Sequence, residues 1–200
     1  MTSFPAVRRA ARLLAAAFLL VVAGGCAASP RLFVNRDADM TLYKKIAILP
    51  FSNLSGDAYA SARVTRSFTT ELLIANRFDL VDPSLLSGEL ERLNAGFDAQ
   101  GQINANKLKD AATAVGATAV IRGAVTEYAV RRSGVSEYPV VSFDAEMIDV
   151  ATGLVVWRIS ISESGKGRLP IVGGQGERTF ARVTQEAAQR AVGILRSKAL

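Results

Sequence analysis

The sequence lacks histidine and has a single cysteine among its 200 residues. Without histidine the chain has no Ser-His-Asp or Cys-His nucleophile system and no His-ligated metal. One cysteine permits no internal disulfide and no Cys-rich zinc site. These absences argue against an enzyme, and we expect no catalytic residue, no metal and no cofactor.

The excess of positive charge says little about partners. The chain has 24 Lys and Arg against 18 Asp and Glu, a formal net charge of +6. Arg8, Arg9 and Arg12 contribute three of these charges, and without them 21 basic residues face 18 acidic ones. The remaining excess of three is weak support for nucleic-acid binding, and we predict none. A composition that is 50% apolar and 21% charged is typical of a globular chain.

The first 25 residues have the features of a secretory signal peptide. A basic segment precedes an apolar run of 11 residues from Leu13 to Ala23, and a membrane-spanning helix needs about 20. The run ends at Ala23-Gly24-Gly25-Cys26, which resembles a bacterial lipobox, although Ala23 stands where Leu is typical. In a lipobox the chain is cut before the cysteine, and the thiol receives lipid. Cys26 is therefore the predicted lipid-attachment site; the alternative is an ordinary residue near a standard cleavage site.

Three regions follow from this interpretation. Residues 1–25 are a signal peptide, 26–43 the lipidated cysteine and a tether in which Leu32-Phe33-Val34 could dock, and 44–200 one domain. Because Ala27 rather than Asp follows the cysteine, resemblance to lipoprotein sorting in enteric bacteria favours the outer membrane, with the domain facing the periplasm.

Hydrophobic periodicity predicts an α/β domain. The order is β-α-β-α-α-β-β-β-α, and a mixed β-sheet with packed helices is its compact solution. Tight turns near Gly134 and Gly153 make the last three strands an antiparallel meander. The predicted strands cover residues 45–50, 77–81, 118–131, 141–147 and 155–162, and the predicted helices cover 59–76, 83–97, 104–115 and 177–198.

Three strings resemble those of CsgG-type curli secretion lipoproteins and TolB amino-terminal-like domains. They are residues 46–57 (IAILPFSNLSGD), 116–123 (GATAVIRG) and 148–157 (IDVATGLVVW). The resemblance implies a periplasmic α/β domain without chemistry of its own. We therefore predict a non-catalytic, protein-binding scaffold of an envelope assembly for secretion, an appendage or cell-wall synthesis. Its expected partners are the membrane, through the lipid anchor, and envelope proteins; a homo-oligomer is left open.

An alternative is a ring-forming subunit of a curli-type secretion channel. Such channels insert two membrane-spanning hairpins into this fold, and each strand of a hairpin needs about 9–11 residues. Only ten residues separate Tyr128 from Pro139, and residues 158–176 are rich in glycine. Neither stretch has the alternating apolar pattern that lipid-facing strands require. The sequence therefore favours a lipid-anchored domain over a pore subunit.

Several other features could carry function. The most motif-like is a loop that could contact a partner, or could be a strand-to-helix turn with Asp57 near the helix cap. Asp144, Glu146 and Asp149 could form an acid/base or cation site, or the solvated face of a strand. Gly173-Gly174-Gln175-Gly176 could hold a phosphate or be a flexible connection, and Arg131-Arg132 could contact headgroups, peptidoglycan or a partner, or be solvated turn charge. The loop consists of Ser52, Asn53, Leu54, Ser55, Gly56 and Asp57.

Overall fold

The computed structural model describes residues 29–98, 103–165 and 179–198. The predicted signal peptide, Cys26 and the glycine-rich loop at 173–176 lie outside the described residues. Within the described ranges, no helix combines the length and the apolar character needed to cross a membrane.

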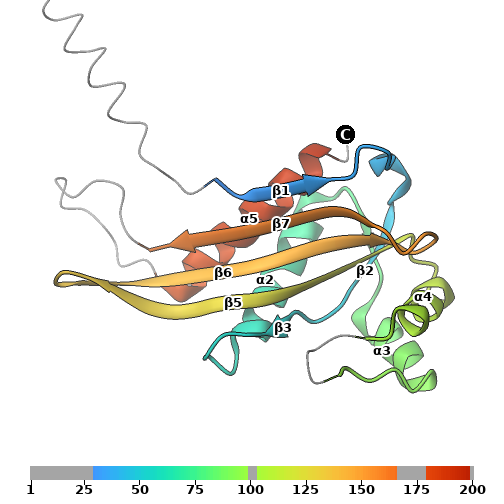
Figure 1. Ribbon diagram of the computed structural model, residues 1–200, viewed down its shortest axis with the longest axis horizontal. Helices are drawn as coiled ribbons and strands as arrows, with labels where there is room; N and C mark the ends of the chain where they lie inside the picture. Colours follow the sequence, from blue (N-terminus) through green and yellow to red (C-terminus); the bar gives the residue numbers. More distant parts are fainter. Residues whose placement is uncertain (1–28, 99–102, 166–178, 199–200) are drawn as a thin grey trace, which may run out of the picture.

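The fold is built on one open mixed sheet with the strand order β1-β7-β6-β5-β2-β4 (Figure 1). A further short strand, β3, pairs with β5. This architecture confirms the predicted α/β class. The strands are β1 (Arg31–Val34), β2 (Lys45–Ile48), β3 (Ser52–Asn53), β4 (Asp79–Leu80), β5 (Ala119–Ser133), β6 (Ser136–Asp149) and β7 (Val155–Ser164). The helices are η1 (a 3-10 turn, Met40–Leu42), α2 (Ala60–Ala75), α3 (Pro83–Arg92), α4 (Ala105–Ala114) and α5 (Phe180–Lys198).

The antiparallel half of the sheet is the predicted meander. β5 pairs with β6, and β6 with β7. The two connections contain Gly134 with φ of 61° and Gly153 with φ of 75°, a left-handed backbone that other residues adopt at a cost. β2 and β4 add in parallel to the other half. The two turn glycines and the period-two pattern therefore made this half of the sheet predictable.

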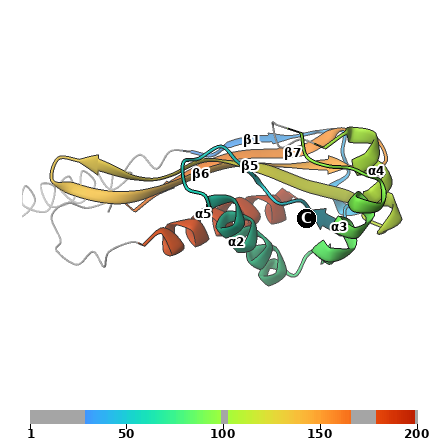
Figure 2. The ribbon, with the colours of Figure 1, turned by 90° about the horizontal axis from the view of Figure 1, so that it is seen from below.

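Helices α2 and α5 cover one face of the sheet (Figure 2). The period-two apolar residues of β5, β6 and β7 point into this layer and bury Trp157 completely. Phe51 packs between Phe68 of α2 and Phe143 of β6, with ring centroids 5.4 and 5.8 Å away. The largest part of the apolar core therefore lies between the sheet and these two helices.

Helices α3 and α4 pack against the opposite side of β2 and of the start of β5, where Ala47, Leu49 and Val120 point. Asp82 caps α3, because its side chain accepts a hydrogen bond from the Ser84 amide, and Pro83 follows in the first turn. Gly116 ends α4 with φ of 70°, as the sequence predicts. These helices cover only part of this face, and the polar side of β5, β6 and β7 is left without a helix over it.

Two short strands differ from the sequence-based expectation. Residues 31–34, which fell within the predicted tether, form β1 and pair with β7, so this stretch docks as an edge strand. Residues 52 and 53, expected in a polar turn, form β3 beside β5. Both strands are too short to produce a recognisable period. Their pairing depends on which long strand offers a free edge, and that is decided by the tertiary fold.

Candidate functional site

The Ser52–Asp57 loop connects β2 to α2 and is held by hydrogen bonds. Asn53 Nδ2 donates to the Asp57 carbonyl at 2.8 Å, and Asn53 Oδ1 accepts from the Ser55 amide at 3.1 Å. Asp57 Oδ1 accepts from the Tyr59 amide at 2.8 Å, just before α2 begins. These bonds give the loop the role of a strand-to-helix turn, with Asp57 near the helix start. The loop leaves Leu54 with 65% of its surface exposed.

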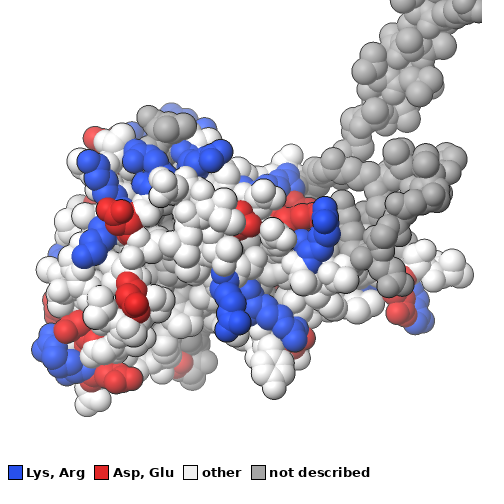
Figure 3. Space-filling view, turned by 180° about the vertical axis from the view of Figure 1, so that it is seen from behind, with Lys and Arg blue, Asp and Glu red and all other residues white. Residues whose placement is uncertain are grey.

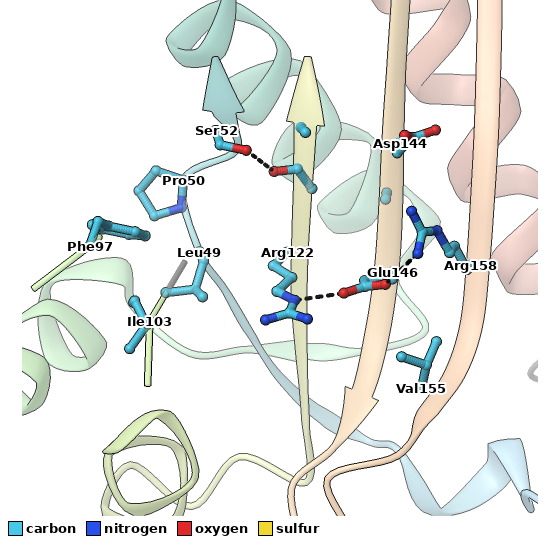
Figure 4. Close-up of a pocket in the computed structure, with 13 residues that line it drawn as sticks. Leu49, Pro50, Ser52, Phe97, Ile103, Arg122, Asp144, Glu146, Val155 and Arg158 are labelled. Atoms are coloured by element: carbon cyan, nitrogen blue, oxygen red, sulfur yellow. Dashed lines mark hydrogen bonds and ion pairs between the residues drawn. The ribbon is translucent and has the colours of Figure 1, made fainter. Parts of the chain in front are cut away.

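A cleft of about 390 Å³ opens beside α3 and α4, on the part of their face of the sheet that these two helices leave uncovered (Figure 4). It brings together the end of β2, the polar faces of β5, β6 and β7, and the segment after α3. Of the predicted loop, only Ser52 lines this cleft, and its Oγ donates to the Gly123 carbonyl at 3.2 Å. The principal side chains of the cleft are Leu49, Phe97, Ile103, Arg122, Asp144, Glu146 and Arg158.

Three charged side chains form an ion cluster across the strands of the cleft (Figure 4). Arg122 Nε donates to Glu146 Oε1 at 2.6 Å, and Arg158 Nη1 lies 3.4 Å from Glu146 Oε2. The Glu146 side chain is only 13% exposed, whereas that of Arg158 is 54% exposed. Because two guanidinium groups engage this carboxylate, the cluster is suited to binding a polar surface and unsuited to general acid/base work.

The three acidic residues considered as a site do not act together. Asp144 and Glu146 share one face of β6 and both line the cleft, as their spacing predicts. Asp149 instead accepts hydrogen bonds from the Ala151 amide at 2.7 Å and from Tyr43 Oη at 3.0 Å. Burial first, and then this hydrogen bond to Asp149, raises the pKa of Tyr43 to about 12. Asp149 therefore has a structural role in the turn after β6.

Metal chemistry finds no support among the residues that the structure describes. They contain no group of three or more His, Cys, Asp and Glu side chains placed to hold an ion. On the face seen from behind, basic and acidic side chains are interspersed and do not gather into one large field (Figure 3). At the hairpin tip, Arg131 and Arg132 form exposed ion pairs with Glu127 and Glu137. The charged side chains of the described residues are therefore arranged in ion pairs that could contact a polar surface, and not in a group that would hold a metal ion.

Three members of the cleft were not predicted from the sequence. Arg122 and Arg158 lie on the outward faces of their strands, and only the register of β5, β6 and β7 shows that both meet Glu146. Phe97 was expected as the last residue of the helix predicted over 83–97. That helix ends at Arg92, Asn94 takes a positive φ of 53°, and Phe97 is left 51% exposed at the cleft. A possible signal was Asn94, since Asn tolerates the left-handed backbone that ends helices.

Solved structures with the same fold are distant in sequence. The chain is 19% identical to the PelC dodecamer of Paraburkholderia phytofirmans, with a TM-score of 0.56, covering 84% of this chain and 96% of that one. It is 17% identical to lipoprotein GNA1162 of Neisseria meningitidis, with a TM-score of 0.50, covering 75% and 99%. The hypothetical protein CT253 of Chlamydia trachomatis is 13% identical with a TM-score of 0.53, covering 78% and 97%. These likenesses show the fold alone, and no curated protein matches the sequence.

The family is identified by residues 23–160, which match the profile described as "Peptidoglycan-synthase activator LpoB". This match corrects the assignment to curli secretion lipoproteins and TolB-like domains, which was wrong, and the channel-subunit alternative has no support. The three strings describe a strand with its turn, a strand and a hairpin, so they report local structure and do not discriminate between families. The family match confirms the location predicted for this chain, which is the periplasmic side of the outer membrane. Because the match covers more than half of its length, the chain belongs to the LpoB family of peptidoglycan-synthase activators.

Proposed function

We propose that this protein is a lipid-anchored, non-catalytic activator that binds a peptidoglycan synthase from the outer membrane. The observation that carries the proposal is the family match over residues 23–160. The cleft is consistent with it, because its charged groups are engaged with one another and leave no activated nucleophile. Activation would then come from binding, which shifts the synthase toward its active conformation.

The proposed contact surface is the open face of the sheet around the cleft. Protein interfaces combine a few large apolar anchors with a polar surround. Phe97 is 51% exposed at the cleft, and Leu54 is 65% exposed in the neighbouring loop that Ser52 joins to the cleft. The Arg122–Glu146–Arg158 cluster supplies donors and acceptors beside these anchors. In this arrangement the predicted loop contributes Leu54 to the interface, while its polar residues hold the turn.

The proposed anchor restricts where the partner can be met. Lipid on Cys26 would be followed by only four residues before β1 begins at Arg31, which is five Cα-to-Cα steps along the chain. A fully extended chain spans at most about 3.5 Å per residue, so the domain would stay within roughly 18 Å of the anchor. The synthase would then have to reach the outer membrane. Replacing Cys26 with alanine should release the protein from membranes, and unchanged membrane fractionation would contradict lipidation.

The activity is tested with the mature protein and a purified peptidoglycan synthase from the same bacterium. We expect faster glycan-chain synthesis and direct binding in a pull-down. Phe97→Asp and Leu54→Asp should each weaken both effects about tenfold or more, as expected for interface anchors. Leu85→Asp is the matched control, because Leu85 is 60% exposed on α3 and does not line the cleft. A synthase that neither binds nor responds to the unmodified protein would refute the proposal.

The oligomeric state stays a prediction. The structure with which the chain shares its fold at a TM-score of 0.56 is described as a dodecamer, but at 19% identity. Mass photometry of the mature protein, alone and with the synthase, would show whether single copies or rings bind. A single copy with full activity would establish that assembly is unnecessary for activation.

A further inference from the structure

A second concave site lies on the opposite side of the molecule from the cleft. This groove, with a volume of about 990 Å³, runs between α2 and the start of α5, beside Tyr128 of β5. It is on the face that α2 and α5 cover, which Figures 2 and 3 show from two directions. The groove is therefore separate from the surface proposed to contact the synthase.

One wall of the groove is aromatic and rigidly held. The rings of Tyr128 and Phe180 stack with centroids 4.6 Å apart and planes 13° from parallel. The Arg63 guanidinium lies 5.6 Å from the Tyr128 ring centroid and 5.7 Å from that of Tyr59, within cation–π range. Arg63 also pairs with Asp57 at 3.3 Å. These side chains are already engaged with one another, so they form a preorganised surface.

Glu71 lines the same groove and is 6% exposed. Its side chain makes no hydrogen bond or ion pair with the described part of the chain. A buried carboxylate without a partner is unfavourable, and such groups are normally paired. Thr184, the other buried polar residue of the groove, donates to the Phe180 carbonyl at 2.7 Å, and its Oγ1 lies 3.4 Å from Tyr128 Oη. Glu71 is thus a largely buried side chain whose carboxylate still reaches the groove, with no partner among the described residues.

Arg66 supplies the opposite charge at the exposed rim of the groove. Its guanidinium has no ion pair among the residues described. Arg66 and Glu71 are five residues apart on α2, which separates them by about 7.5 Å along the axis and about 140° around it. At that spacing helix neighbours do not face each other, since pairs form at three or four residues. Helix α2 therefore presents a cation and an anion to the groove, and neither has an ion pair among the described residues.

We propose that this groove binds a short peptide that carries both a free ammonium group and a free carboxylate. The ammonium pairs with Glu71, the carboxylate pairs with the Arg66 guanidinium, and the aliphatic part lies against the Tyr128–Phe180 stack. Such a ligand compensates both unpaired charges at once. The inference goes beyond activation of the synthase and does not rest on it.

The test uses Nα-acetyl-lysyl-alanine, which has one ammonium group and one carboxylate. The mature protein is titrated by isothermal calorimetry, and a dissociation constant near 1 mM or tighter is expected for two charged contacts. Nε-acetylation, which removes the ammonium charge, and C-terminal amidation, which removes the carboxylate, should each weaken binding about tenfold.

The protein variants assign each contact. In Glu71→Gln, Nε-acetylation of the ligand should no longer weaken binding, whereas amidation still should. In Arg66→Gln, amidation should no longer weaken binding, whereas Nε-acetylation still should. The control replaces the Arg92–Glu89 pair of α3, 2.8 Å apart, by Arg92→Gln and should change nothing. Thermal unfolding checks that Glu71→Gln is folded, and the exposed Arg66→Gln variant tests the proposal independently. No binding of any probe by the unmodified protein, or responses that do not pair in this way, would overturn it.

Discussion

Gly123 occupies the most crowded point between β5 and β6, so its replacement by alanine tests the packing of the fold. A Cβ atom there would lie 2.4 Å from the Asp144 carbonyl oxygen and 2.8 Å from Phe51 Cε2. Neither neighbour can move freely. The carbonyl belongs to the paired strand β6, and Phe51 is 2% exposed and packed against Phe68 and Phe143. The added methyl group must therefore push the two strands apart or displace a core ring.

The expected cost of Gly123→Ala follows from these contacts. Overpacking a close-packed core by one methyl group costs about 1–3 kcal/mol, and a contact with backbone lies at the upper end. We therefore expect a loss of about 3 kcal/mol in the free energy of unfolding. Urea denaturation followed by circular dichroism measures it, and the midpoint should fall without a change in slope.

Two further variants make the reasoning on Gly123 refutable. Adding Phe51→Leu to Gly123→Ala should recover part of the loss, because the smaller side chain removes the ring contacts but not the carbonyl contact. Gly193→Ala is the matched control: Gly193 lies in α5 with nothing within 4 Å of an added Cβ, and alanine there should stabilise by about 0.5–1 kcal/mol. An unchanged midpoint for Gly123→Ala would refute the packing argument.

The remaining predictions concern single polar groups. The pKa of Tyr43 is raised to about 12. The stabilisation that its protonated side chain gives the folded state is therefore complete below the ordinary pKa of about 10 and is lost between roughly pH 10 and 12. Between these pH values the free energy of unfolding should fall less in Tyr43→Phe than in the unmodified protein, by on the order of 2 kcal/mol. An equal fall in both proteins would argue against the burial of Tyr43 and its contact with Asp149. Glu146→Gln should lower the free energy of unfolding by about 1–2 kcal/mol, which is less than for a fully buried ion pair, because one of the two arginines is half exposed. No change in urea denaturation would mean that solvent already screens the cluster. Asp82→Ala should lower the free energy of unfolding by about 1 kcal/mol, because the hydrogen bond to the Ser84 amide at the start of α3 is lost. Asp82→Asn can still accept that hydrogen bond, so it should retain most of the stability in the same assay.

Much of the fold was readable because it depends on local chemistry. A few neighbouring residues suffice to predict three of its features: the capped start of α3 at Asp82-Pro83, the left-handed Gly116, and the alternation around Trp157. Short apolar runs and turn glycines work in the same way. The edge strands β1 and β3 were missed, since their only reason to be extended is a neighbouring strand far away in the chain.

The candidate sites were harder to predict for the same reason. The motif-like loop at 52–57 was visible, but its polar side chains are engaged in hydrogen bonds within the loop and to neighbouring residues, and Leu54 is its exposed apolar side chain. The family was also misread, because short strings report strands and turns that different families share. The family profile combines weak signals from many positions between residues 23 and 160, so it distinguishes families that the three short strings cannot.

By itself, the sequence determined the absence of histidine chemistry, the α/β class and the faces of each long strand, because composition and period are local properties. The lipid anchor at Cys26 stays a prediction. Only the tertiary structure decided which outward residues meet. The register of three strands joins Arg122 and Arg158 to Glu146, which lie 24 and 12 residues away. Packing of α2 against α5 leaves Glu71 largely buried in a groove, without a partner among the residues that the structure describes, and no spacing along the chain reveals this groove. Sites made from distant segments depend on register and helix packing, and these are set by the whole core at once.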